Sequence, residues 1–388
     1  MRQVCLLGAT GSIGDSTVDV IRQHPDRFSL YAVAAHSNWK KVAEIAQKFK
    51  VKQLCMFDAN AAKELSRALN RPVLSGIEGL KELALDPNTD LIVNAVMGSV
   101  GCLPTLAAIA AGKHVALANK ETMVMAGPVI QDALKENPKA YITPIDSEHN
   151  AIFQCLAGRS SEEVECLQIT ASGGPFREWP KEKFETITVK DALNHPVWSM
   201  GKKITIDSAS MMNKGFEVIE AKWLFGVKPE QIEVVVHPQS VIHSMVEYKD
   251  GAVIAQLGHP DMREPIQYAL TWPLRLPLNN RKLNFADLAK MTFYAPDKEK
   301  FPALELAYRS LEKGGNMACI MNAANEAAVA AFLQEKIGFY DITDVVSGCM
   351  AGADFAASPD LDAIFRTNED TLAMAAEKIS RLSGRKSF

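Results

Sequence analysis

The 388-residue sequence lacks paired cysteines, long apolar runs and an excess of basic residues. Its seven cysteines are widely spaced without a CxxC pair, which is typical of reduced thiols in a cytosolic protein. No uncharged apolar stretch reaches the ~18 residues of a membrane span, and the apolar start runs into glycines too early for a signal peptide. The formal charge of −4 provides no basic footprint for nucleic acid. We therefore expect a cytoplasmic protein without membrane or nucleic-acid partners.

The sequence also lacks a clustered set of zinc ligands, because its eight histidines are scattered and no His or Cys pair has ligand spacing. Hydrophobic residues make up 47% and charged residues 23%, as in ordinary globular proteins. The length favours two or three domains.

The order of apolar patterns predicts an α/β protein with three regions and a linker. Residues 1–146 alternate buried strands such as "QVCLLGA" and "FSLYAVAAH" with amphipathic helices such as "NWKKVAEIAQKF", which indicates a doubly wound parallel sheet of the Rossmann-like type. Residues 147–272 mix strands with the helix "NKGFEVIEAKWLF", as in an α+β catalytic domain. Residues 273–301 are rich in Pro, Asn and Lys and predict a linker, and residues 302–388 predict a helical domain.

A glycine-rich turn predicts a dinucleotide site. Gly8, Gly11 and Gly14 follow the first strand and open a helix, where a pyrophosphate can meet backbone N–H groups. A glycine-rich turn without a ligand is the alternative. The second strand ends in His36, Ser37 and Asn38 and lacks the acid typical of NAD sites, which favours the 2′-phosphate of NADP(H).

Another strand leads into Asn119, Lys120 and Glu121, at the edge where such sheets bind ligands. These three residues can clamp a cofactor, or can be a loop with an ordinary surface ion pair.

Two acids, Asp146 and Glu148, follow the last strand of the first region. Paired carboxylates suit a hard divalent cation. A helix starting near Asn213 would place Asn213, Glu217 and Glu220 on one face, which nominates Glu217 as a third carboxylate. Capping of the following helix is the alternative role for the Asp146 segment.

A second turn, Ser172-Gly173-Gly174, can form an anion nest directly after a strand. Ser172, Ser208, Asn213 and Lys214 are the groups expected around a phosphate. The irregular stretch over about residues 173–203 predicts a flexible flap, with His195, Trp198 and Met200 facing a ligand. A tryptophan in such a loop can otherwise be a core anchor.

Taken together, several stretches resemble the 1-deoxy-D-xylulose 5-phosphate reductoisomerase family. They are "GATGSIG", "ALANKE", "PIDSEHNAIFQ", "ASGGPFRE", "HPVWSMGKKITIDSASMMNKGFEVIEA", "VHPQSVIHSMVEYKDGAV", "PDMREPI" and "NAANEAAVAAFL". They run in family order from residue 8 to about residue 332, and "DSEHNAIFQ" and "NKGFEVIEA" are highly specific.

The resemblance implies roles for particular residues. The metal ligands for Mg²⁺ or Mn²⁺ would be Asp146, Glu148 and Glu217, which with Lys120 form the catalytic set. The substrate contacts would be Lys120, Ser147, Glu148, Ser172, His195, Trp198, Ser208, Asn213, Lys214 and Glu217. The cofactor contacts would be Gly8, Thr10, Gly11, Ser12, Ile13, Ser37, Asn38, Asn119, Glu121 and Gly201. Family members often carry a basic residue where Ser37 stands here, so Lys40 or Lys41 would have to substitute for it.

The implied reaction isomerises 1-deoxy-D-xylulose 5-phosphate and reduces the product with NADPH to 2-C-methyl-D-erythritol 4-phosphate, in non-mevalonate isoprenoid biosynthesis. The family habit is a homodimer. One alternative is another NADP-dependent oxidoreductase of the semialdehyde or homoserine dehydrogenase type; a phosphorylating semialdehyde enzyme would need a nucleophilic cysteine. The other is a nucleotide sensor without chemistry, which would need no carboxylate trio.

Overall fold

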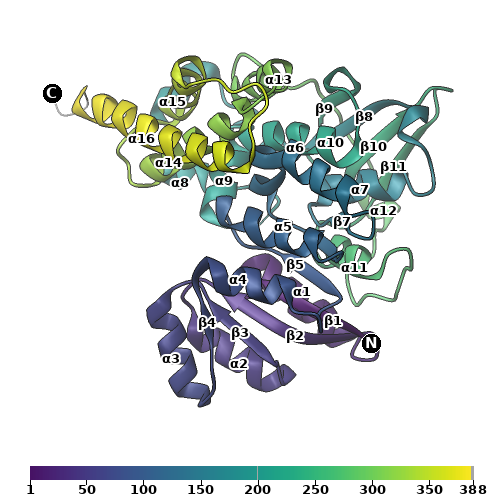
Figure 1. Cartoon of the computed structure of the whole chain (residues 1–388). Coiled ribbons are helices and arrows are strands. Elements are labelled where there is room, and N and C mark those ends of the chain that lie inside the picture. The colour runs from purple at the N-terminus through teal and green to yellow at the C-terminus, as the bar shows by residue number, and fades with distance from the viewer. Residues whose placement is uncertain (199, 386–388) are drawn as a thin grey trace. The chain divides into compact units, whose positions relative to one another are not determined.

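The computed structural model describes residues 1–198 and 200–385 of the chain. Residue 199 of the predicted flap and the last three residues of the predicted helical region lie outside them. The chain divides into two compact units (Figure 1). The first comprises Met1–Thr122, Ile130–Phe153 and Asp261–Lys282, and the second comprises Met123–Val129, Gln154–Pro260 and Leu283–Phe388.

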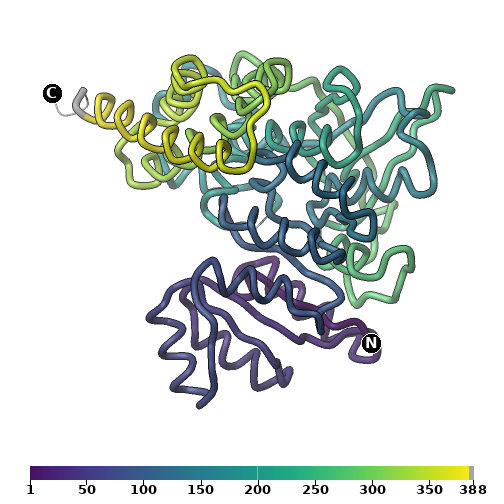
Figure 2. Tube along the Cα trace, in the orientation of Figure 1, coloured from purple at the N-terminus to yellow at the C-terminus, as the bar shows by residue number. Residues whose placement is uncertain are grey.

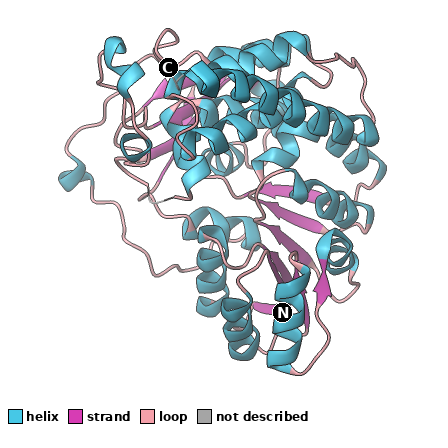
Figure 3. Cartoon of the chain, turned by 90° about the vertical axis from the view of Figure 1, so that its left-hand side faces the viewer, coloured by secondary structure: helices cyan, strands magenta, loops and turns pink. Residues whose placement is uncertain are grey.

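The first unit is built on a seven-stranded sheet in the order β4-β3-β2-β1-β5-β6-β7, with every neighbouring pair parallel. Helices cover both faces of this sheet (Figure 3). The predicted doubly wound parallel sheet is therefore confirmed. Its elements are β1 Arg2–Leu7, α1 Ser12–Gln23, β2 Phe28–Ala35, α2 Trp39–Phe49, β3 Gln53–Met56, α3 Ala59–Leu69, β4 Leu74–Ser75, α4 Gly76–Leu85, β5 Leu91–Asn94, α5 Cys102–Ala110, β6 His114–Leu117, the two ends of α6 Lys120–Glu136, β7 Tyr141–Pro144, most of α7 Ser147–Cys155 and α11 Arg263–Thr271.

Alternating side chains along the strands supply two apolar faces to this sheet. Val4 and Leu6 of β1 belong to a core cluster with α1, α2, α3 and α11. On the opposite face α4 packs so closely that a Cβ at Gly79 would lie 2.8 Å from the Cys55 sulfur of β3. Both faces are buried, which is why these strands read as continuous apolar runs.

A late segment of the chain returns to this unit. Helix α11 supplies Ile266, Ala269 and Leu270 to the core cluster. The Arg2 side chain at the start of β1 donates a hydrogen bond of 2.9 Å to the Leu270 carbonyl. Figure 2 shows the green trace of this helix beside the purple first strand. Residues 261–282 are thus structurally part of the first unit.

His114, at the start of β6, makes the first unit sensitive to acid. Its Nδ1 accepts from Arg2 at 2.7 Å and its Nε2–H donates to the Thr143 hydroxyl at 2.7 Å. Burial, assisted by the Arg2 guanidinium, lowers the pKa of His114 from 6.5 to about 3. Between these two pKa values His114 is protonated in the unfolded chain and neutral in the folded chain. The stability present above pH 6.5 is therefore lost as the pH falls toward 3.

We expect His114→Gln to flatten this pH dependence, because the amide can keep both hydrogen bonds without titrating. Within the window each pH unit removes about 1.4 kcal/mol from the unfolding free energy of the unaltered protein. The thermal unfolding midpoint should therefore fall less for the variant than for the parent between about pH 7.5 and about pH 5. Equal falls for the two proteins would contradict the assignment.

The second unit contains a four-stranded sheet in the order β11-β10-β8-β9, in which only β8 and β9 pair in parallel among the described strands. The predicted mixed sheet and C-terminal helices are confirmed. The elements are β8 Val164–Ala171, α8 Val189–Ala192, α9 Lys202–Ala209, α10 Met212–Phe225, β9 Ile232–Val236, β10 Ile242–Tyr248, β11 Val253–Leu257, α12 Phe285–Leu288, α13 Ala303–Lys313, α14 Met317–Leu333, α15 Phe339–Gly352 and α16 Leu361–Arg385.

Helix α10 lies in the core of the second unit, and residues 214–221 are buried along its length. A Cβ at Gly215 would lie 3.0 Å from the Ala307 Cβ, so α10 and α13 approach closely at this glycine. Burial of nearly a whole helix makes the polar residues on α10 unusual, since buried charges are rare unless paired. Among the residues described, no helix has both the length and the apolar character needed to cross a membrane.

Candidate active site

The turn after β1 leaves no room for a side chain at two of its glycines. Gly8 has a φ of +92°, and a Cβ there would lie 2.3 Å from the Ala95 carbonyl oxygen. A Cβ at Gly14 would lie 2.5 Å from the Gly8 carbonyl oxygen. Gly11 and Ser12 are exposed at the start of α1, so its first N–H groups are accessible. The predicted cofactor residues from Gly8 to Ile13 therefore form a backbone cradle suited to an anion.

The end of β2 continues this cradle. His36, Ser37 and Asn38 are exposed directly after Ala35. The Asn38 side chain caps α2 by accepting from the Lys41 N–H at 3.3 Å. The His36 ring stacks on Phe57, with 5.5 Å between ring centroids. Ser37 and Asn38 thus stand where a dinucleotide ribose is recognised in such folds.

Asn119 connects the loop after β5 to the start of α6 at the carboxyl edge of the sheet. Its amide donates to the carbonyls of Val96 at 2.9 Å and Gly98 at 3.0 Å, and to a Glu121 oxygen at 3.1 Å. Its oxygen accepts from the Thr122 N–H and caps α6. Asn119 is only 1% exposed, so the alternative of an ordinary surface ion pair does not describe this loop.

Lys120 and Asp146 lie together because their strands are neighbours. Leu117 of β6 pairs with Pro144 of β7, so the ends of the two strands coincide. Lys120 begins α6 and its ammonium forms an ion pair with Asp146. The lysine side chain is 8% exposed and the aspartate side chain 16% exposed. Removing either partner of a pair this well buried would leave the other charge uncompensated.

The two predicted acids lie at the start of α7, directly after β7. An Asp146 oxygen accepts from the Glu148 N–H at 3.2 Å, so Asp146 also caps the helix. The Ser147 hydroxyl donates to Glu148 at 2.5 Å, and His149 Nδ1 lies 3.6 Å from Asp146. Capping and ligand binding, posed above as alternatives, are therefore compatible at this residue.

The third predicted acid, Glu217, is fully buried in α10. Asn213 donates to one of its oxygens at 2.5 Å, and the Lys214 ammonium forms an ion pair with the other. The helix predicted to begin near Asn213 begins at Met212, and Asn213 and Glu217, at i and i+4, meet on one face of it. Lys214 is 4% exposed, so this charge pair lies in the unit's interior.

Ser172 and His195 are brought together from two separate segments. The Ser172 hydroxyl accepts from the Gly174 N–H at 3.2 Å and lies 3.1 Å from His195 Nε2. His195 Nδ1 accepts from the N–H groups of Val197 and Trp198. The proton of the neutral ring is therefore assigned to Nε2, which donates to Ser172.

Ser208 completes this neighbourhood in the last turn of α9. A Cβ at Gly174, whose φ is +67°, would lie 3.0 Å from the Ser208 carbonyl oxygen. The turn after β8 and the end of α9 are thus in close contact. Gly201 caps the other end of α9, where it is exposed.

The predicted flap has an anchored part and an exposed part. Phe184 is fully buried and packs on Phe176, Phe301 and Tyr340. From residue 194 to 201 the described residues are half-buried or exposed. The Trp198 ring lies 6.3 Å from the His243 ring, centroid to centroid.

Sequence reasoning missed Asp207, which neighbours Ser208. It is 2% exposed, pairs with Lys203 at 3.0 Å and accepts from Asn325 of α14 at 2.8 Å. These bonds hold the last turn of α9 in place. The signal was present as two asparagines in the alanine-rich "NAANEAAVAAFL", because buried amides need partners.

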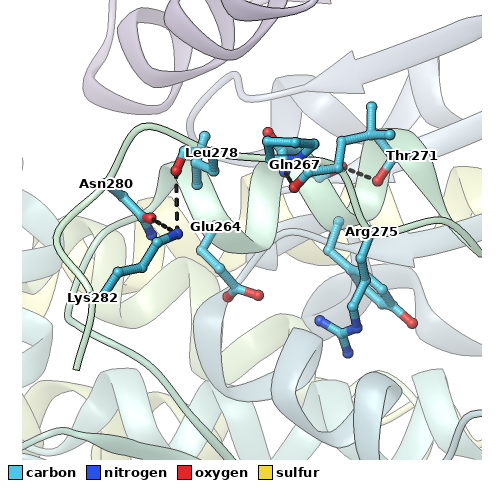
Figure 4. A pocket seen from close by; sticks show the side chains of 10 residues that line it. Glu264, Gln267, Thr271, Arg275, Leu278, Asn280 and Lys282 are labelled. Atoms are coloured by element: carbon cyan, nitrogen blue, oxygen red, sulfur yellow. Dashed lines mark hydrogen bonds between the residues drawn. The ribbon is translucent and has the colours of Figure 1, made fainter. Parts of the chain in front are cut away.

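A separate hollow of about 190 Å³ lies between α11 and the loop that follows it (Figure 4). Gln267 donates to the Leu276 carbonyl, Thr271 to the Leu274 carbonyl and Lys282 to the Leu278 carbonyl. These bonds hold the loop onto α11, and none of the predicted site residues lines the hollow.

The cysteines do not support thiol chemistry. All seven are free and buried. Burial, with Glu233 and Glu247 nearby, raises the pKa of Cys166 to about 12. A thiol with such a pKa is protonated at neutral pH, which disfavours the phosphorylating semialdehyde enzyme.

Three family models match the chain in sequence order. The 1-deoxy-D-xylulose 5-phosphate reductoisomerase model matches residues 4–127, the model for the C-terminal domain of that enzyme matches residues 142–225, and the DXP reductoisomerase C-terminal domain model matches residues 257–374. Relatives carrying the enzyme's name include one from Chlorobium chlorochromatii, 52% identical over 90% of this chain and 92% of its own length. Another, from Bacillus cereus, is 48% identical over 98% of this chain and 100% of its own length.

Solved structures of the same enzyme superpose on the whole chain. The enzyme from Zymomonas mobilis in complex with NADPH has a TM-score of 0.91 at 45% identity, covering 97% of this chain and 99% of that one. A DOX-P reductoisomerase in complex with NADPH, fosmidomycin and magnesium has a TM-score of 0.94 at 42% identity, covering 98% of both chains.

Proposed function

This chain belongs to the 1-deoxy-D-xylulose 5-phosphate reductoisomerase family, and from that premise we propose which of its residues perform the reaction. It is an NADPH-dependent oxidoreductase that isomerises and reduces 1-deoxy-D-xylulose 5-phosphate to 2-C-methyl-D-erythritol 4-phosphate, with a divalent metal. The observation that carries the proposal is the buried Lys120–Asp146 pair beside Glu148 at the carboxyl edge of the first sheet. This arrangement joins a cation to two potential metal ligands.

The cofactor is proposed to bind along the edge formed by the β1 turn, the end of β2 and the Asn119 loop. A Cβ at Gly8 or Gly14 would clash with neighbouring backbone, which supports this proposal. Glycines at such positions allow a tight turn and a close approach of the backbone to a pyrophosphate. Thr10, Gly11, Ser12 and Ile13 would meet the phosphates, and Asn119 and Glu121 the nicotinamide half. Gly201, at the start of α9, is proposed as a further contact. The cofactor supplies reducing equivalents when bound.

The metal is proposed to be held by Asp146, Glu148 and Glu217. The donor set supports this, because carboxylate oxygens are what Mg²⁺ and Mn²⁺ prefer, and these three acids are a group that could hold one ion. Asn213 and Lys214 orient the Glu217 carboxylate. When bound, such an ion acts as a Lewis acid toward substrate oxygens.

The substrate phosphate is proposed to lie among Ser172, Ser208, Asn213 and Lys214. The contact of Gly174 with Ser208 and the Ser172–His195 bond support this, because they gather hydroxyl, imidazole and backbone N–H donors in the second unit. His195 Nε2–H, which donates to Ser172 here, is proposed to donate to a phosphate oxygen. Trp198, held by the His195 ring, would cover the substrate.

The chain's own residues then have defined tasks. Lys120 places positive charge beside the substrate oxygen that becomes negative during isomerisation, and its bond to Asp146 keeps the ammonium in position. Ser147 is proposed to bind a substrate hydroxyl. Its own hydroxyl donates to Glu148, so its oxygen can accept a hydrogen bond from the substrate. The phosphate does not react; its binding energy orients the substrate, and the segment around Trp198 excludes water from the aldehyde.

We also propose a homodimer in the cytoplasm. Strand β11 is an edge of the second sheet, and its Val253 is 50% exposed and its Ile254 36% exposed. An apolar edge strand is a template for pairing with another strand. The seven free cysteines support a reducing compartment. Light scattering coupled to gel filtration should give twice the 42.4 kDa chain mass.

The activity is tested by following NADPH oxidation at 340 nm with 1-deoxy-D-xylulose 5-phosphate, first with Mg²⁺ and then with EDTA. Metal-dependent oxidation establishes substrate, cofactor and metal together. A folded protein that binds NADPH but oxidises none would contradict the proposed site.

A further inference from the structure

The 2′-phosphate of NADPH needs a cationic partner that the end of β2 does not provide in the usual place. His36, Ser37 and Asn38 follow the strand, and the His36 ring is stacked on Phe57. The Ser37 hydroxyl can bind a phosphate, but it carries no full charge. Discrimination between NADPH and NADH depends on charge-assisted bonds to that phosphate.

Lys41 in the first turn of α2 points back toward the glycine turn. Its ammonium donates to the Thr10 carbonyl at 3.2 Å. It also pairs with Asp15 of α1, at 2.6 Å between Nζ and Oδ1. The ammonium therefore bridges the end of β2 and the β1 turn, which are the two segments that flank the adenosine ribose in this fold.

The neighbouring lysine is directed elsewhere. The Lys40 ammonium lies over the Trp39 ring, 5.8 Å from its centroid, and the residue is exposed. Lys41 is more constrained, with its side chain 30% exposed. Of the two lysines, Lys41 is the one with an ammonium held against the glycine turn.

Asp15 is the acidic partner of Lys41. Its side chain is 57% exposed and stands in the first turn of α1, near where the cofactor phosphates bind. An uncompensated carboxylate there would repel them. Lys41 neutralises that charge through its ion pair with Asp15.

We propose that Lys41 is the residue that recognises the 2′-phosphate of NADPH, and that Asp15 holds its ammonium in place until the cofactor arrives. Ser37 completes the phosphate site. This inference rests on NADPH being the cofactor of the proposed function. It adds a specificity-determining residue to that function.

The test compares Lys41→Gln with the matched variant Lys40→Gln and the charge-preserving Lys41→Arg. Binding of 2′,5′-ADP, 5′-AMP, NADPH and NADH is measured by calorimetry, in EDTA and without substrate. Lys41→Gln should weaken 2′,5′-ADP and NADPH by about tenfold or more, as expected for loss of one bond to a charged group. Its affinities for 5′-AMP and NADH should change less than about twofold. Lys40→Gln and Lys41→Arg should keep the preference of the parent.

A further variant separates charge from position. Asp15→Asn should tighten 2′,5′-ADP roughly threefold, because it frees Lys41 and removes a repulsive charge. Equal weakening of 2′,5′-ADP and 5′-AMP by Lys41→Gln would overturn the proposal, since the lysine would then only support the turn. Loss of the preference in Lys40→Gln alone would assign the role to that lysine instead. A parent protein that fails to prefer NADPH would count against the cofactor assignment itself, independently of Lys41.

Discussion

Glu217→Gln is expected to abolish metal-dependent turnover while leaving NADPH binding intact. The amide keeps the size of the side chain but removes the charge that a divalent ion needs. Loss of one hydrogen-bond donor in an active site lowers kcat by about 10²–10³, and loss of a metal ligand should cost at least about a thousandfold. Asp146→Asn should have the same effect from the other unit of the chain. The measurements are NADPH oxidation over a range of Mg²⁺ and Mn²⁺ concentrations, and NADPH binding in EDTA.

Stability must be followed in parallel, because Glu217 is fully buried against Lys214. Breaking a buried pair costs about 3–5 kcal/mol, so the thermal midpoint of Glu217→Gln should fall. Glu220→Gln is the matched control: it makes the same change at a buried acid one turn along α10 and should retain turnover. Loss of NADPH binding in either ligand variant, or full activity in Glu217→Gln, would contradict the proposed metal site.

Lys120→Met should produce the second largest loss of kcat, and unlike Glu217→Gln it should leave metal dependence in place. The methionine fills the space of the lysine stem without its charge, so the oxyanion loses its cation and kcat should fall by about 10²–10³. Metal dependence should persist, and metal affinity should be unchanged or higher, because the Asp146 carboxylate is no longer neutralised by the ammonium. Turnover at saturating substrate and the metal concentration giving half-maximal rate provide both readouts.

Lys113→Met is the control for Lys120. Lys113 is 8% exposed, precedes the opposite end of the same strand β6 and bonds Thr89 at 2.7 Å. The Lys113→Met variant should be less stable than the parent protein but keep its kcat. If Lys120→Met kept its kcat, or lost activity only through weaker metal binding, the ammonium would be a support for Asp146 and not a participant in the reaction.

Local pattern was sufficient to predict the first sheet and the helix that carries Glu217. Strand alternation and the glycine turn are patterns of only a few residues. Asn213 and Glu217 are one helical turn apart, so their spacing predicts that their side chains meet. The family motifs then extended these segments to the fold class, the reaction and the cofactor, all of which the comparisons support.

Tertiary structure alone decided the contacts between distant segments. No spacing predicts that residues 261–282 return to the first unit, that His195 donates to Ser172, or that Asn325 holds Asp207. Nor does the sequence choose Lys41 over Lys40, which are adjacent on one helix; the choice follows from the direction of α2 relative to the β1 turn. Such contacts depend on how whole elements pack, because each is made by side chains whose separation along the chain says nothing about their separation in space.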